Sequence, residues 1–149
     1  MSMRILATLL FFACSCLAHD CPWMNTATAS DLLGGSVTAA ATKNTCSFTL
    51  QQSGAVKSIH IRVRPLPIMG IRKYRKRCRN TAIPVNGLGN EAFACRAKSP
   101  HKATVERLAG RVRQHAFIVD VSTSKPHANR TKLIYIAKET AGQVAGNLF

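Results

Sequence analysis

Acidic residues are scarce in this sequence of 149 residues, which has 6 Asp and Glu against 21 Lys and Arg. Hydrolases with paired carboxylates, and carboxylate metal sites, therefore have few candidate residues. The sequence also lacks an apolar run long enough for a transmembrane helix, which needs about 20 such residues. Hydrophobic residues make up 46% and charged residues 18% of the chain. This composition argues against disorder and collagen-like repeats and is typical of a globular domain.

Motifs of catalysis and cofactor binding are missing as well. The sequence has no G-x-S-x-G motif of serine hydrolases, and Gly87-Leu88-Gly89 lacks the third glycine of a dinucleotide fingerprint, so a tight turn explains it better. After the N-terminal segment, no cysteines are spaced as the C-x-x-C pair of a zinc site. We therefore predict no cofactor, no metal and no enzymatic activity.

The N-terminus has the pattern of a secretory signal peptide over residues 1–18. Arg4 precedes an apolar run from Ile5 to Ala13 that contains one polar residue, Thr8, and small residues lead to Ala18. Cleavage after Ala18 would leave one domain, residues 19–149, and the loss of Arg4 would lower the net charge from +15 to +14. The pattern predicts a secreted or periplasmic protein. Lipid anchoring at Cys14 or Cys16 is the alternative, although the residues before each cysteine match a lipobox poorly.

Four cysteines remain after the signal segment: Cys21, Cys46, Cys78 and Cys95. An even number in an exported chain predicts two disulfides. Three pairings are open, and the one with the shortest loops joins Cys21 to Cys46 and Cys78 to Cys95. Each disulfide would add about 3 kcal/mol by constraining the unfolded chain.

Two segments have the spacing of helices. Ala29, Leu32 and Leu33 precede Gly34-Gly35, which predicts a short helix with Thr26 or Thr28 as its N-cap. At the other end, apolar residues recur every three or four positions over residues 131–148, which predicts an amphipathic helix.

Alternating patterns predict strands between these helices. Residues 46–50 and 56–63 form a hairpin pattern with His60, Arg62 and Arg64 on the wet face, and residues 92–96 and 116–122 are further strands. Residues 104–113 fit either a helix or a strand, and the adjoining run favours a strand. The predicted fold is therefore α+β, with an antiparallel sheet of about four to five strands packed against the N-terminal short helix and the C-terminal amphipathic helix.

The most unusual segment is residues 71–79, where six of the nine residues are basic: Arg72, Lys73, Arg75, Lys76, Arg77 and Arg79. The six acidic residues of the whole chain cannot neutralise them, so we expect an anion-binding patch that attracts polyanions such as anionic lipid or envelope polysaccharide. Only Tyr74 interleaves an aromatic ring, which makes nucleic acid the less favoured partner. The alternative is a solvated face that only keeps the protein soluble.

A set of short motifs resembles a known kind of protein. Cys21-Pro22-Trp23 precedes the first helix, Cys46-Ser47-Phe48 begins a strand, and Gly87-Leu88-Gly89-Asn90-Glu91-Ala92 precedes another strand. With the C-terminal helix, this pattern resembles small exported bacterial proteins and cell-envelope lipoproteins of unknown function. The resemblance implies that the first cysteine pairs with the strand cysteine, and it carries no enzyme activity.

Together these patterns predict an exported, non-enzymatic binding or structural module of the bacterial cell envelope. The alternative is a small secreted phosphodiester hydrolase in which His60 and His115 act as general base and acid, with Lys57 or Arg113 holding the phosphate. Ordinary surface histidines would explain the same residues. The sequence leaves the oligomeric state open.

Overall fold

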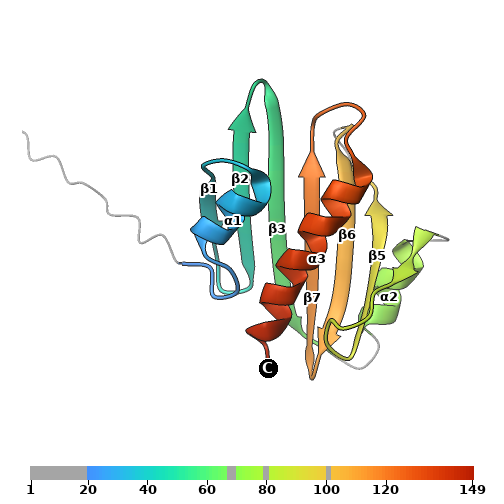
Figure 1. The fold of residues 1–149 in the computed structure, drawn as a ribbon. Helices are drawn as coiled ribbons and strands as arrows, with labels where there is room; N and C mark the ends of the chain where they lie inside the picture. Colours follow the sequence, from blue (N-terminus) through green and yellow to red (C-terminus); the bar gives the residue numbers. More distant parts are fainter. Residues whose placement is uncertain (1–19, 67–69, 79–80, 100–101) are drawn as a thin grey trace, which may run out of the picture.

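The computed structural model describes residues 20–66, 70–78, 81–99 and 102–149. Within them, three helices and one sheet of seven strands form the fold (Figure 1). The predicted signal peptide, with Cys14 and Cys16, lies outside the described residues, as does Arg79 of the basic segment.

The first helix, α1, spans Thr26–Leu33. Its N-cap is Asn25, whose side-chain oxygen accepts a hydrogen bond from the backbone N–H of Thr28 at 2.8 Å. The prediction of Thr26 or Thr28 as the cap was therefore wrong, because the asparagine before them already satisfies a free N–H of the first turn. Gly34 ends the helix as predicted, in the left-handed conformation that glycine adopts without strain (φ 84°).

The sheet is antiparallel throughout, which confirms the predicted α+β class. Its strands are β1 (Thr38–Ala41), β2 (Thr45–Gln52), β3 (Ala55–Pro65), β4 (Ile83–Pro84), β5 (Glu91–Ala97), β6 (Thr104–Val112) and β7 (His115–Thr123). Seven strands exceed the four to five predicted, because the two short edge strands have no alternating pattern. In particular, β1 is rich in alanine, which is depleted in strands, and β4 contains a proline. The ambiguous segment at residues 104–113 is a strand.

The order across the sheet is β1-β2-β3-β7-β6-β5-β4. After β3 the chain forms α2 (Gly70–Arg77) and β4 at the far edge, then returns through β5 and β6 until β7 pairs with β3. In that pairing Ile59 lies opposite Val121, and Ile61 lies opposite Val119. Because β3 pairs with β2 on one side and with β7 on the other, it lies inside the sheet rather than at an edge.

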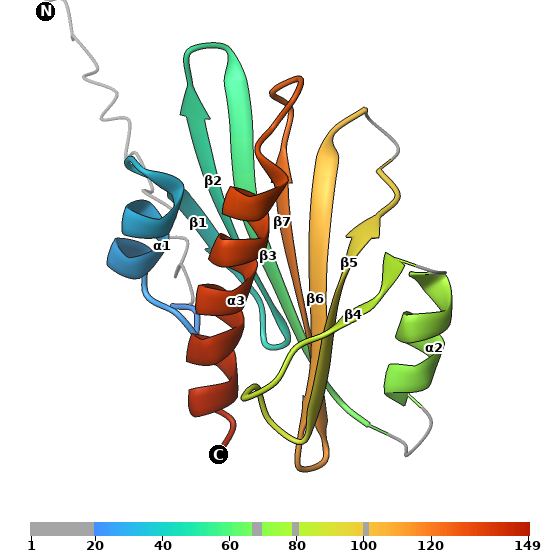
Figure 2. The same ribbon diagram turned by 45° about the vertical axis from the view of Figure 1, so that its right-hand side comes forward.

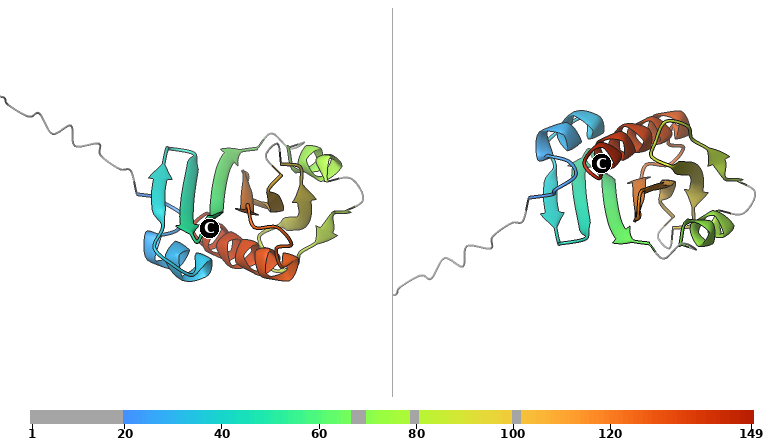
Figure 3. Two further views of the ribbon diagram at one scale, coloured as in Figure 1. Left: turned by 90° about the horizontal axis from the view of Figure 1, so that it is seen from above. Right: turned by 90° about the horizontal axis from the view of Figure 1, so that it is seen from below.

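Helices cover both faces of the sheet. Figures 2 and 3 show α1 and α3 (Arg130–Gly146) on one face, and α2 on the other face near the β4–β5 edge. The main core lies under α1 and α3, where alternate residues of β3 and β7 pack against apolar residues of α3. Gly110 faces Phe117 across β6 and β7, and a side chain at residue 110 would meet the Phe117 ring.

A smaller core lies under α2. It joins residues of the helix region to three strands of the sheet: Ile71, Cys78, Phe93, Cys95, Ala109 and Ile118. These residues are nearly inaccessible to solvent. The opposite face of the sheet is therefore apolar beneath α2, and this packing fixes the position of the basic helix.

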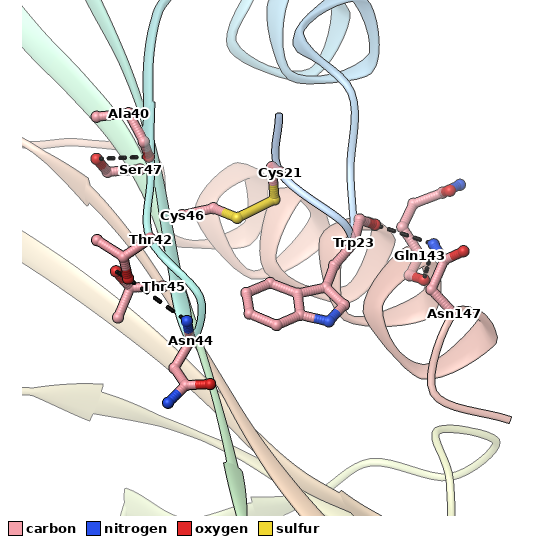
Figure 4. The surroundings of a disulfide bond; sticks show 10 residues. All are labelled: Cys21, Trp23, Ala40, Thr42, Asn44, Thr45, Cys46, Ser47, Gln143 and Asn147. Carbon is pink, nitrogen blue, oxygen red and sulfur yellow. Dashed lines mark hydrogen bonds between the residues drawn. A yellow bond between two sulfur atoms is a disulfide. The ribbon is translucent and has the colours of Figure 1, made fainter. Parts of the chain in front are cut away.

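Two disulfides join Cys21 to Cys46 and Cys78 to Cys95, the pairing with the shortest loops, with Cα–Cα distances of 5.7 and 5.6 Å. Figure 4 shows the first of them, and the buried Trp23 belongs to the same core. The Trp23 carbonyl accepts a hydrogen bond from the side chain of Asn147, which links the start of the described chain to its end. Disulfides are typical of proteins that fold in an oxidising compartment. In the described ranges, no helix is both long and apolar enough to cross a membrane.

Candidate anion-binding site

The basic segment forms helix α2 over Gly70–Arg77, and three of its side chains attach it to the sheet. Ile71, Tyr74 and Cys78 follow one another at steps of three and four residues, so they share one face. Ile71 and Cys78 are buried in the smaller core, with Tyr74 packed against it. The disulfide from Cys78 to Cys95 then fixes the end of the helix to β5. Arginine and lysine are also good helix formers, and those of the last turn complement the helix dipole.

Five cations lie on the exposed surface of this helix: Arg72, Lys73, Arg75, Lys76 and Arg77. None of them forms an ion pair with any residue that the structure describes. The ion pairs found there occupy three of the six acids, Glu91, Glu106 and Asp120, and all are made with arginines outside α2. The positive charge of the helix is therefore uncompensated.

Four of the five cations of the helix line two separate cavities. Lys73 and Arg77, four residues apart, face a cavity of about 470 Å³ between α2 and strands β3, β6 and β7. We call this cavity the arginine pocket, and its polar lining residues are Arg62, Arg64, Lys73, Tyr74, Arg77 and Arg107. Apolar atoms of Pro65, Leu66 and Ala116 complete the wall. Positive side chains from three elements of the fold, β3, α2 and β6, thus meet at one place.

On the other flank, Arg72 and Arg75 line a cavity of about 460 Å³ beside the turn that precedes β5. These are its two basic residues, and it includes the carboxylate of Glu91, which also pairs with Arg111. Its charge is therefore much closer to neutral than that of the arginine pocket. The described cations of the predicted patch therefore do not all line one cavity.

Asp120 on β7 binds two of the arginines that line the arginine pocket. Its two carboxylate oxygens accept hydrogen bonds from Nε and Nη2 of Arg107 at 2.6 and 2.8 Å, and the second oxygen also accepts from Nη2 of Arg62 at 3.2 Å. The hydrogen bond to Asp120 raises the pKa of Arg107 further above its ordinary value. The Nε of Arg62 is buried and has no hydrogen-bond partner among the described residues. One carboxylate thus positions two arginines and leaves a donor unused.

His60 lies next to this group, directly opposite Asp120 in the pairing of β3 with β7. Burial lowers the pKa of His60, and the positive charge of Arg62 lowers this pKa further. The carboxylate of Asp120 opposes that shift, and Arg107 adds to it. At neutral pH the imidazole is therefore uncharged, and the positive potential around it comes from the arginines.

The structure does not bring His60 and His115 together. Asp120 opposes His60, and His115 lies five residues earlier on β7, which is an odd number and therefore puts the two imidazoles on opposite faces of the sheet. The offset along the strand adds about 16 Å at roughly 3.3 Å per residue. This geometry does not allow the two histidines to act as base and acid on one phosphate.

The two candidate phosphate ligands of that hydrolase are also dispersed. The Lys57 ammonium donates a hydrogen bond to the carbonyl of Leu33 in α1, on the face opposite His60. Arg113 lies in the turn between β6 and β7, with its guanidinium 5.9 Å from the centre of the Phe149 ring. The described residues contain no cluster of three or more His, Cys, Asp or Glu side chains that could hold a metal ion.

Sequence reasoning identified Lys73 and Arg77 as candidate anion-binding residues, but it missed Arg107 and the joining of Arg62 and Arg64 to α2. The alternating pattern does place Arg62 and Arg64 on the wet face of β3. The missing information was the long-range pairing of β3 with β7, which brings these residues beneath the helix. No protein-family model matches the chain, and neither does any curated protein or solved structure. The resemblance to exported envelope proteins therefore stays a prediction.

Proposed function

We propose that the protein is an exported, non-enzymatic binding module of the bacterial cell envelope that holds anionic lipid or envelope polysaccharide on its basic surface. One observation carries this proposal. The five cations of α2 have no ion-pair partner in the described chain, and a disulfide and a small apolar core hold them in place. A free basic tail would relieve the repulsion between its charges by extending, whereas this helix keeps them together.

The proposed location follows from two features. The N-terminal 18 residues have the pattern of a secretory signal, and the two disulfides suit a compartment outside the cytoplasm. Outside the inner membrane, the abundant polyanions are lipid headgroups and phosphorylated polysaccharides. The exported chain, with a net charge of +14 after loss of Arg4, is attracted to both over about one Debye length, or roughly 8 Å at physiological salt. We place the protein in the periplasm or outside the cell, with lipid anchoring at Cys14 or Cys16 as the alternative.

Binding to vesicles at two salt concentrations tests the proposal. The mature chain, residues 19–149, is mixed with phosphatidylglycerol vesicles, with neutral phosphatidylcholine vesicles, and with a phosphorylated cell-wall polysaccharide. We expect binding to at least one anionic preparation and none to the neutral one, with affinity falling as salt rises.

The matched variant replaces six cations by glutamine: Arg72, Lys73, Arg75, Lys76, Arg77 and Arg79. Each lost cation should remove about 1 kcal/mol of binding free energy if the partner is an anionic membrane. The five of these residues that the structure describes are exposed, so their replacement leaves the two cores intact. Unaltered binding by this variant would show that the helix is only a solvated face.

A further inference from the structure

We infer that the arginine pocket is a specific site for a phosphorylated sugar, with the phosphate held by its cations and the sugar ring lying against Tyr74 and the apolar wall. This inference rests on the proposed function and deepens it, because it assigns the anion-binding role to one pocket and one chemical class of ligand. The surface of α2 alone would attract any polyanion. A pocket with a defined shape and fixed side chains can select one class of anion.

The charge of the pocket favours a multiply charged oxyanion. Five cationic side chains line it, and the neighbouring carboxylate is that of Asp120, already bound by Arg107 and Arg62. A single carboxylate ligand would therefore leave most of the charge unpaired. A phosphate monoester carries a charge of roughly −1.5 to −2 at neutral pH and offers three acceptor oxygens.

The chemistry of the cations points the same way. Four of the five are arginines, whose planar guanidinium can bind phosphate with two parallel hydrogen bonds. The Arg64 side chain forms no hydrogen bond or ion pair with the described residues, and the buried Nε of Arg62 has no hydrogen-bond partner among them. Arg64 is exposed, so its guanidinium is available to an incoming anion without breaking the contacts of Asp120 with Arg107 and Arg62.

The size of the pocket calls for more than a phosphate ion. A volume of about 470 Å³ lies within the range of small-molecule sites, roughly 300 to 1,000 Å³, and far exceeds that of one phosphate. Tyr74 supplies a ring with a polar tip, and Pro65, Leu66 and Ala116 supply apolar surface. A sugar ring has both hydroxyl groups and C–H faces, which matches a wall of this mixed character.

The pocket is also organised before any ligand binds. The backbone N–H of Leu66 donates to the carbonyl of Gln114 at 2.8 Å, which holds the end of β3 against the β6–β7 turn. The guanidinium of Arg77 lies over the Tyr74 ring, 5.8 Å from its centre. Side chains that are already positioned lose less entropy on binding, so they increase affinity and selectivity.

The test uses isothermal titration calorimetry of the mature chain with glucose 6-phosphate, inorganic phosphate and glucose at low salt. We expect glucose 6-phosphate to bind more tightly than inorganic phosphate, and glucose not to bind. The pocket variant combines Arg64→Gln, Lys73→Gln and Arg77→Gln. Because each lost charged hydrogen bond costs about tenfold or more in affinity, this variant should bind glucose 6-phosphate at least tenfold more weakly.

The matched control combines Arg72→Gln, Arg75→Gln and Lys76→Gln, which removes the same charge from residues outside the pocket. We expect it to keep its affinity within about threefold, since only screened long-range attraction is lost. Circular dichroism verifies that both variants fold, and Arg64→Gln alone replaces the pocket variant if it does not. An equal loss in both variants would overturn the pocket and leave the proposed function standing.

Two further results separate the two proposals. Equal affinity for inorganic phosphate and glucose 6-phosphate would overturn the assignment of a sugar, and binding to phosphatidylglycerol vesicles alone would overturn the pocket in favour of a membrane surface. If the wild-type chain binds no sugar phosphate, vesicle or polysaccharide at low salt, both proposals fail. If a sugar phosphate attached to a lipid binds as well as the free sugar phosphate, the assignment of the pocket stands and the ligand comes from a glycolipid.

Discussion

Removal of the Cys78–Cys95 disulfide should both destabilise the protein and weaken its binding to anions. Helix α2 spans eight residues, which is too short for a stable helix in water on its own. Like charges also face each other four residues apart, at Arg72 with Lys76 and at Lys73 with Arg77, which opposes the helix further. The helix therefore depends on the small core beneath it and on the disulfide.

The size of the stability effect follows from the loop that the disulfide closes. Cys78 and Cys95 are 17 residues apart, which gives about 3 kcal/mol by the chain-entropy relation. For a domain of this size, that loss should lower the melting temperature by roughly 10 °C. Alanine is the suitable replacement, because both cysteines are buried and a serine hydroxyl would have to be desolvated.

A second disulfide provides the control. Cys21 and Cys46 are 25 residues apart, so their replacement by alanine should cost about 3.5 kcal/mol. This disulfide lies in the core under α1, away from the basic helix. Calorimetry should therefore show a similar drop in melting temperature for the two double variants.

Only the Cys78→Ala, Cys95→Ala variant should lose affinity for phosphatidylglycerol vesicles, by about tenfold, which corresponds to one or two cationic contacts at roughly 1 kcal/mol each. Full affinity of this variant, at a temperature where it is folded, would refute the claim that the Cys78–Cys95 disulfide holds the cations of α2 in place for binding. A melting temperature equal to that of the wild type would refute the stability argument.

Three other changes test separate parts of the structure. Because the pKa of His60 is lowered from 6.5 in the folded protein, its contribution to the free energy of unfolding should be complete above about pH 6.5 and should fall as the pH drops toward the folded-state pKa. Urea unfolding of His60→Gln should lack this fall. A variant with the same pH profile as the wild type would contradict the prediction. Gly110→Ala should lower the free energy of unfolding by about 1 to 3 kcal/mol, because the added methyl group clashes with the Phe117 ring. Adding Phe117→Leu to this variant should restore part of the lost stability. Arg130→Met should cost about 1 to 3 kcal/mol in the same assay, since the buried Glu106 would keep only Arg96 at 3.5 Å; a cost no greater than that of Arg96→Met would count against it.

Strong periodic patterns made much of the fold predictable from sequence. The alternation in residues 56–63 and 116–122 identified the two central strands, and the three-to-four spacing of apolar residues identified α3. The strands β1 and β4 were not predicted, because their residues have little intrinsic preference for a strand and each strand is stabilised by pairing with its neighbour. A Thr-Ala-Ala-Ala segment has little preference for a strand until β2 lies beside it.

The candidate site was harder to predict, because its parts are close in space and far apart in sequence. The run of cations in α2 was visible in the sequence, but the placement of four of them in two cavities depends on which helix face carries Ile71, Tyr74 and Cys78. Arg107 appeared as an ordinary residue of an ambiguous segment. Its role follows from the register of β6 with β7, which places it opposite Asp120.

The most direct test of the account is to locate the bound anion. A ¹⁵N-labelled mature chain titrated with glucose 6-phosphate at low salt should show its largest shift changes at the backbone N–H groups of α2 and at the Nε–H groups of Arg62, Arg64 and Arg107. Those changes should diminish as sodium chloride is added, since screening weakens the attraction. Shift changes confined to β1 and β2, or spread evenly over the described chain, would contradict the claim that α2 and the strands beneath it form the anion-binding site.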